Sequence, residues 1–154
     1  TDVDFVKGSK NLNFHKENML NFLPLICYEI IFENYIRNNV NSETAFIINI
    51  TNDAWFGTTI GPHQHYQFSK IRAVEFGLPI YRVANSGITA IVDPYGDEVK
   101  KIELNERNSI NWFLLKKLDK TFFGSYGNNI FIILLSYVFL LNIFIFKSNR
   151  KEAL

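Results

Sequence analysis

The alternation of apolar and polar residues predicts that strands and helices share most of the chain. Short apolar runs at 22–27 and 44–51 are typical of strands, and the second is expected to be covered on both faces of a sheet. Helical spacing marks Glu29–Arg37. A second helix is predicted over His63–Phe76, ending at Gly77, because glycine is a common C-terminal cap.

Turn residues separate three further expected strands. The runs PIYRVAN (79–85) and ITAIVD (88–93) are broken at Asn85-Ser86-Gly87, and PYGD (94–97) has the composition of a tight turn. The run EVKKIEL (98–104) alternates as an exposed edge strand would. This order predicts an α/β fold of the layered α+β kind, with helices packed on a sheet.

The end of the chain has a different pattern. Residues 130–146, IFIILLSYVFLLNIFIF, form a run of 17 residues without a charge. A membrane-spanning helix needs roughly 17–25 such residues, and a buried globular helix would normally show a polar face. We therefore predict a transmembrane helix here, after a linker at 121–129. A very apolar core helix or a pair of strands is the alternative.

The tail at 147–154 is basic, which predicts a cytoplasmic position for it and the opposite side of the membrane for residues 1–129. The start, TDVDFVKGSKN, has neither the basic nor the apolar region of a signal peptide, and Thr1 is not a start methionine. We expect the chain to begin inside a larger protein.

Composition excludes several classes of function. The 154 residues suffice for about one domain. The 16 Lys and Arg against 15 Asp and Glu leave no basic footprint for nucleic acid. A single cysteine rules out an internal disulfide framework.

That cysteine, Cys27, ends an apolar strand and is followed at once by a helix. A helix N-terminus stabilises a thiolate, and the next backbone N–H groups can bind an oxyanion. This placement suits acyl chemistry through a thioester. The alternative is a buried structural cysteine. Glu29, two residues on, could orient an amine or act as a base, or could simply be an acidic residue that complements the helix dipole.

Other polar residues are weaker candidates. His63 and His65 could bind a metal or pair with Cys27, but a spacing of two places them on different faces of a helix, so we expect no metal and no cofactor. Arg72 and Glu75, three apart on the same helix, are expected to form a structural ion pair.

Several segments together resemble one family. ICYEIIFENYIR, then INITNDAWFGTTIGPHQHYQFSKIRAVEFGLPIYRVANSGITAIVDPYG, and the terminal apolar run are similar to the C-terminal part of bacterial apolipoprotein N-acyltransferase. That family carries a carbon–nitrogen-hydrolase (nitrilase-like) domain among membrane helices. NSG stands where NNG is common in the family. The resemblance implies that residues 1–120 are the C-terminal half of an αββα sandwich, followed by one transmembrane helix.

The resemblance also implies an activity and its residues. The family transfers an acyl chain from a phospholipid to the α-amine of the N-terminal, diacylglyceryl-modified cysteine of an apolipoprotein. Cys27 would be the nucleophile, Glu29 a second functional residue near the thioester, and Tyr28 a backbone donor to the oxyanion. The loop residues expected at the substrate are Asn52, Asp53 and Trp55, with Trp55 on the lid where an acyl chain enters; by itself Trp55 could equally anchor the loop.

The family's glutamate base and lysine lie upstream of the cysteine, and only 26 residues precede Cys27 here. Lys7, Lys10 and Lys16 do not lie in the family's lysine motif, so no role is assigned to them. We expect an inner-membrane enzyme, a monomer with its catalytic domain in the periplasm, of which this piece is inactive by itself. A membrane-anchored nitrilase-superfamily amidase and a non-catalytic remnant are the alternatives.

Overall fold

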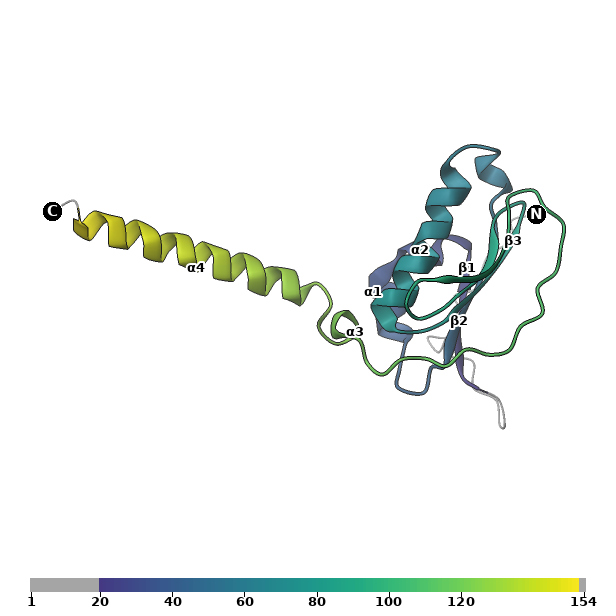
Figure 1. Ribbon diagram of the computed structural model, residues 1–154, viewed down its shortest axis with the longest axis horizontal. Helices are drawn as coiled ribbons and strands as arrows, with labels where there is room; N and C mark the ends of the chain where they lie inside the picture. The colour runs from purple at the N-terminus through teal and green to yellow at the C-terminus, as the bar shows by residue number, and fades with distance from the viewer. Residues whose placement is uncertain (1–19, 153–154) are drawn as a thin grey trace, which may run out of the picture. The chain divides into compact units, whose positions relative to one another are not determined.

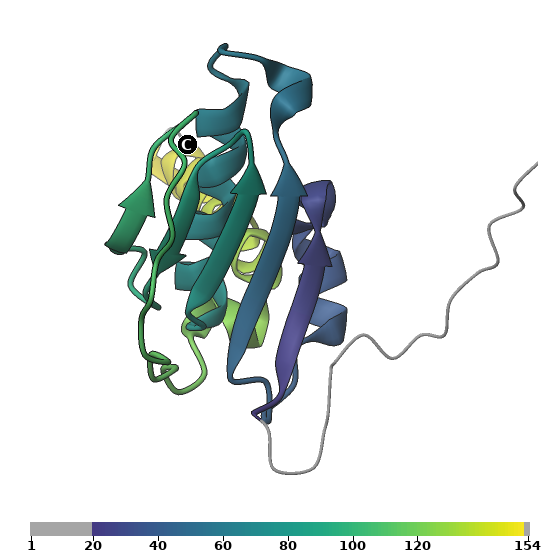
Figure 2. The same ribbon diagram turned by 90° about the vertical axis from the view of Figure 1, so that its right-hand side faces the viewer.

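A single five-stranded sheet organises the first part of the protein. The computed structural model describes residues 20–152, with side chains up to residue 145. The chain divides into two compact units, 1–121 and 122–154. In the first, the sheet order is β1-β2-β3-β4-β5 (Figure 2). Its strands are β1 Phe22–Ile26, β2 Phe46–Asn52, β3 Ile80–Asn85, β4 Thr89–Val92 and β5 Glu98–Ile102.

Strand direction divides the sheet in two. β1, β2 and β3 are parallel, so their carboxyl ends meet at one edge of the sheet. β4 and β5 continue it in antiparallel fashion. The expected exposed edge strand is confirmed as β5, at the end of the sheet.

Helices cover one face of this sheet. They are α1 Glu33–Asn39 and α2 Gly61–Phe76, and the 3₁₀ turns η1 Cys27–Ile31 and η2 Ala54–Phe56 follow β1 and β2. Figures 1 and 2 show α1 and α2 on the same face, with the extended segment 103–120 across the other. The expected stop of α2 at Gly77 is confirmed, since that residue has a left-handed φ of 64°. The core lies between the helices and the sheet and includes Leu23, Leu25, Ile30, Ile36, Ile47, Ala73, Phe76 and Ile80.

Two local predictions differ from the structure. The helix expected over 29–37 is interrupted at Phe32, whose extended backbone (φ −89°, ψ 91°) separates a 3₁₀ turn, η1, from α1. The strand expected to be covered on both faces, now β2, alternates between buried and exposed residues. Within the described residues only its helix-facing side is buried, and Ile50 remains 53% exposed on the other.

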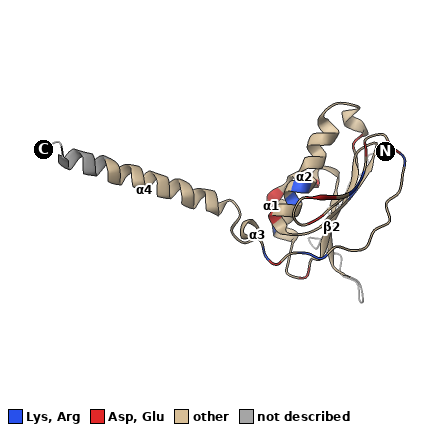
Figure 3. Cartoon of the chain, viewed as in Figure 1, with Lys and Arg blue, Asp and Glu red and all other residues tan. Residues whose placement is uncertain are grey.

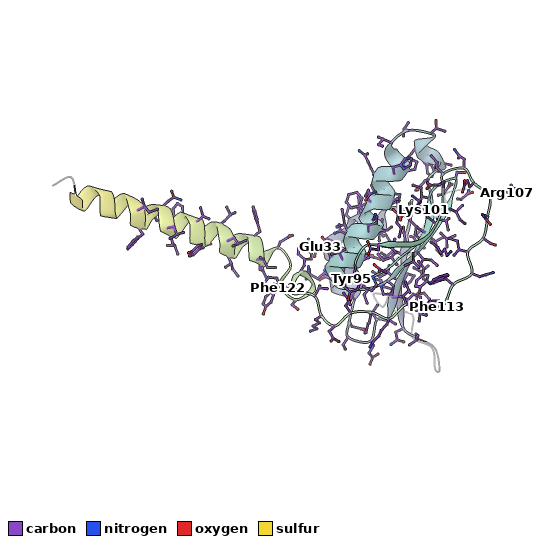
Figure 4. All side chains as sticks on the ribbon, viewed as in Figure 1. Glu33, Tyr95, Lys101, Arg107, Phe113 and Phe122 are labelled. Carbon is purple, nitrogen blue, oxygen red and sulfur yellow. The ribbon has the colours of Figure 1, made fainter. Side chains whose placement is uncertain are left out.

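An aromatic row lies on that other face. The rings of Phe22 and Phe46 stack at 5.3 Å, and Tyr81 meets Phe46 edge-on at 5.5 Å. The Tyr81 hydroxyl accepts a hydrogen bond of 2.8 Å from the backbone N–H of Leu115. Figure 4 labels the neighbouring Phe113 in the segment that crosses this face. The segment is therefore anchored on the sheet through Tyr81.

The second unit consists of α3 Phe122–Tyr126 and α4 Asn129–Glu152. The apolar run 130–146 lies within α4, so it forms a helix and not a strand pair. No charged residue is marked on the described part of α4 in Figure 3. Among the helices within residues 20–152, none is both long and apolar enough to cross a membrane. The spanning helix stays a prediction.

Candidate active site

Cys27 lies where β1 passes into η1, at the edge formed by the carboxyl ends of the parallel strands. Its backbone is left-handed, with φ of 49°. Such a conformation costs a non-glycine residue about 1–2 kcal/mol and persists only where surrounding contacts impose it. The side chain is partly exposed. The structure thus presents the thiol on a constrained turn at the end of a strand.

Glu29 contributes to that constraint. One carboxylate oxygen accepts a hydrogen bond of 2.6 Å from the Ile26 N–H, and the other accepts one of 3.2 Å from the Tyr35 hydroxyl. Burial and the Glu29 carboxylate raise the pKa of Tyr35. Glu29 therefore stabilises the first turn of η1, which contains Cys27. An acidic residue at the start of a helix also complements the helix dipole. The functional role that the resemblance gives it stays a prediction.

Arg72 holds the far end of the same turn. Its guanidinium donates to the carbonyls of Ile30 (3.0 Å) and Ile31 (2.7 Å). The predicted ion pair with Glu75 is also formed. The sequence spacing indicated the ion pair but not the link to η1, because that link joins residues more than forty positions apart. Arg72 ties α2 to the segment that carries Cys27.

A buried polar cluster lies beneath the cysteine. Asp53 is fully buried and accepts hydrogen bonds from Arg82 at 2.6 Å and from His65 at 2.8 Å. Burial raises the pKa of Asp53, but the hydrogen bond from His65 and the charge of Arg82 outweigh it and leave the pKa lowered. Asp53 is therefore ionised, and Arg82 neutralises it.

Arg82 extends the cluster toward the backbone at Cys27. It donates to the Asn49 side-chain oxygen and, at 3.2 Å, to the Ile88 carbonyl. The Asn49 amide in turn donates to the carbonyls of Leu25 and Cys27, both at 3.2 Å. Burial lowers the pKa of Arg82, and the attraction of Asp53 opposes that effect. Arg82 thus orients the Asn49 amide, which is hydrogen-bonded to the backbone carbonyl of Cys27.

The two histidines of the His-x-His pair are far from equivalent. His63 is exposed, whereas His65 is buried against Asp53. Because ionised Asp53 can only accept, Nδ1 of His65 carries the proton of their hydrogen bond. Within the described residues Nε2 has no hydrogen-bond partner. The ring packs on Tyr28, with centroids 5.0 Å apart.

The three loop residues expected at the substrate occupy different surroundings. Trp55 is 85% exposed, on η2. Asn52 is also exposed, and its side-chain oxygen accepts a hydrogen bond of 3.1 Å from Ala54. Asp53, in contrast, is buried and bonded internally. Direct substrate contact is thus compatible with Trp55 and Asn52, and the contacts of Asp53 indicate a supporting position instead.

Sequence reasoning missed Asn49, Thr51 and Arg82. The Thr51 hydroxyl lies 3.3 Å from the Cys27 sulfur and 3.1 Å from Asp53. A signal was available: Asn49 and Thr51 are polar residues two apart among the isoleucines of β2, so they share one face. In the described part of the chain, the Thr51 hydroxyl is the one group hydrogen-bonded to the sulfur.

Chemically, this arrangement can present a nucleophile. It combines a constrained and partly exposed thiol with a buried network that fixes its backbone and touches its sulfur. The N–H of Tyr28, at the second position of η1, is one of the helix-start groups that lack an intrahelical acceptor. Its predicted use as an oxyanion donor stays a prediction.

The chain was compared with a model of a protein family and with the sequences of curated proteins. The model of the carbon-nitrogen hydrolase family matches residues 13–111. An apolipoprotein N-acyltransferase of Rickettsia bellii is 47% identical over 141 residues, 91% of this chain and 28% of the relative. One from Rickettsia prowazekii is 51% identical over 140 residues, 90% of this chain and 28% of the relative. The chain thus spans 28% of the length of these relatives.

Solved structures share the fold at lower identity. A nitrilase-superfamily protein of Saccharomyces cerevisiae matches with a TM-score of 0.56 and 20% identity, over 66% of this chain and 40% of that one. A mutant of an amidase from Nesterenkonia sp. AN1, which shows acrylamide added at its active-site cysteine, matches with a TM-score of 0.50 and 19% identity, over 65% of this chain and 41% of that one. The fold of the sheet and its helices is therefore nitrilase-like.

Proposed function

We propose, because the chain belongs to the carbon-nitrogen hydrolase family, that it is part of an enzyme that transfers a fatty acyl chain from a phospholipid to the N-terminal amine of an apolipoprotein. The observation that carries this proposal is the position of Cys27 on a left-handed turn at the carboxyl end of β1. The Thr51 hydroxyl is hydrogen-bonded to its sulfur. The Rickettsia relatives, at 47% and 51% identity, support the choice of acceptor by their names.

The first step forms the acyl-enzyme. The Cys27 thiolate attacks the ester carbonyl of the phospholipid, and the negative charge moves to the carbonyl oxygen. When the carbon–oxygen bond breaks, the lysophospholipid leaves as an alcohol, having taken up the proton that the thiol gave to a base. The acyl chain then remains on the sulfur as a thioester.

The second step transfers the chain. The α-amine of a diacylglyceryl-modified cysteine attacks the thioester carbonyl, the carbon–sulfur bond breaks, and an amide forms. The amine loses one proton, and the sulfur returns to a thiol or thiolate. Because the family's base and lysine lie upstream of the cysteine, we propose that this chain has to act together with that upstream part, and that residues 1–154 are inactive by themselves.

We propose a role for each residue of the site. Cys27 acts as the nucleophile, and the Tyr28 N–H donates to the oxyanion. Glu29 keeps the turn closed through Ile26 and Tyr35. Trp55, exposed on η2, is proposed to meet the acyl chain. From the resemblance, we also propose that residues 130–146 span the inner membrane and that the catalytic unit lies in the periplasm. The proposal requires no oligomer.

The test is a transfer assay with the full-length protein in detergent. A phospholipid with a labelled acyl chain is the donor, and a diacylglyceryl-cysteine peptide is the acceptor. We expect an N-acyl peptide from the wild type, none from Cys27→Ala, and none from residues 1–154 alone. The Asn108→Ala variant, in the exposed segment 103–120, is a control expected to retain the activity.

Product analysis separates the alternatives. Release of free fatty acid or ammonia without an N-acyl peptide would indicate an amidase-type hydrolase. Neither product from any donor would indicate a remnant without catalysis. Transfer that survives Cys27→Ala would contradict the assignment of the nucleophile.

A further inference from the structure

The hydroxyl of Thr51 lies between two groups that compete for its single proton. Its oxygen is 3.3 Å from the Cys27 sulfur and 3.1 Å from an Asp53 carboxylate oxygen. A hydroxyl donates one hydrogen bond and accepts up to two. Thr51 can therefore donate to the sulfur or to the carboxylate at any moment, but not to both.

The protonation state of the sulfur decides between these two arrangements. A Cys27 thiol can donate its own proton to the Thr51 oxygen, and the Thr51 hydroxyl then donates to Asp53. A thiolate can only accept, so the Thr51 hydroxyl turns and donates to the sulfur. Hydrogen bonds to charged groups are stronger than those between neutral groups, so the turned arrangement stabilises the thiolate.

Asp53 loses little when Thr51 turns away. The same carboxylate keeps the hydrogen bond from His65 at 2.8 Å and the one from Arg82 at 2.6 Å. No buried group is left without a partner by the turn, so the desolvation cost that normally opposes such a change is avoided. The carboxylate charge beside the sulfur is in turn neutralised by Arg82, which also attracts the Cys27 thiolate.

We propose that Thr51 is a positioning residue whose hydroxyl donates to Asp53 while Cys27 is a thiol and to the sulfur while Cys27 is a thiolate. Thr51 is 6% exposed, so water does not readily replace its hydroxyl. The proposal rests on the proposed function for the use of the sulfur as a nucleophile. The charged or titratable groups around this pair are Glu29 on η1, Asp53 after β2, His65 on α2 and Arg82 on β3.

The experiment follows alkylation of Cys27 by iodoacetamide as a function of pH, in the full-length protein, by mass analysis of the peptide that contains Cys27. Thr51→Val removes the hydroxyl and keeps the shape, whereas Thr51→Ser keeps the hydroxyl. We expect Thr51→Val to slow alkylation at neutral pH by about tenfold or more, the factor of one hydrogen bond to a charged group, and to move the midpoint of the pH profile upward. Thr51→Ser should stay within about threefold of the wild type, since it retains that hydrogen bond.

Controls separate this effect from simple loss of structure. Thr89→Val removes another strand hydroxyl, which bonds to the backbone of Ala84, and should leave the profile unchanged. The plateau rate at high pH, where the sulfur is ionised in every variant, reports its accessibility. Thr51→Ala is the second variant if Thr51→Val does not fold.

A Thr51→Val profile that superimposes on the wild type would overturn the proposal, as would a Thr51→Ser profile shifted as far as that of Thr51→Val. Alkylation needs no acyl donor. Acyl transfer that persists in Cys27→Ala would therefore refute the proposed function and leave the result on Thr51 standing.

Discussion

The buried pair of Arg82 and Asp53 gives the sharpest prediction for stability. Both side chains have an exposed fraction of 0%. Replacing Arg82 with methionine keeps an unbranched apolar chain but removes the charge that neutralises Asp53. It also removes the donors to the Asn49 side chain and to the Ile88 carbonyl. Arg82→Met therefore leaves one charge and two polar acceptors buried without these partners.

Breaking a buried ion pair by removing one member costs about 3–5 kcal/mol. At about 1.4 kcal/mol for each factor of ten, the folded-to-unfolded ratio should fall by about two to three and a half orders of magnitude. We expect Asp53→Asn, added to Arg82→Met, to recover part of this loss, because the unpaired charge is then gone.

The assay is chemical denaturation of the full-length protein in detergent, followed by the fluorescence of its tryptophans. Arg107→Met, in the exposed segment labelled in Figure 4, is the matched control and should change the free energy of unfolding by less than about 0.5 kcal/mol. A loss below about 1 kcal/mol for Arg82→Met would refute the reasoning. So would a double variant less stable than Arg82→Met itself.

Three further predictions follow from neighbouring contacts. Because the pKa of Asp53 is lowered in the folded state, the ionised carboxylate stabilises the fold above the unfolded-state pKa of about 3.9. This stabilisation is lost as the pH falls through the lower folded-state pKa. Asp53→Asn should therefore flatten the acid side of a plot of melting temperature against pH. Arg72→Met leaves the carbonyls of Ile30 and Ile31 without their donor and should lower the free energy of unfolding by about 2–3 kcal/mol in denaturant titrations. The control Lys70→Met breaks the surface ion pair with Glu98 and should lower it by less than about 1 kcal/mol. Gly87→Ala would place a Cβ in steric conflict with an Asp53 carboxylate oxygen. It should lower the free energy of unfolding by about 1–3 kcal/mol, and with it the melting temperature. An unchanged melting temperature would show that Asp53 can move.

Much of the fold could be predicted because local patterns and tertiary packing agree. Each strand of the sheet was expected within a few residues, since apolar runs and turn residues mark strands directly. The break at Phe32 was missed because η1 is held by Glu29 at one end and Arg72 at the other. The contact with Arg72 is tertiary, and helical spacing does not encode it.

Of the candidate site, the sequence allowed only the central residue, Cys27, to be predicted, with its surroundings left open. Cys27 stood out as the single thiol at a strand end. The network beneath it joins side chains from separate elements, so Arg82 on β3 and His65 on α2 became neighbours of Asp53 only after folding. Asp53 illustrates the difference: its position in the NDAWFG loop suggested the substrate, but its burial places it in that network.

The most direct test of the central claim is the intact mass of the full-length protein purified with its lipids, compared with Cys27→Ser. The account predicts a mass increase of one fatty acyl group in the wild type, removed by hydroxylamine and absent from the variant. A wild-type protein that is active in transfer but carries no acyl group on Cys27 when donor is present and acceptor is absent would contradict it.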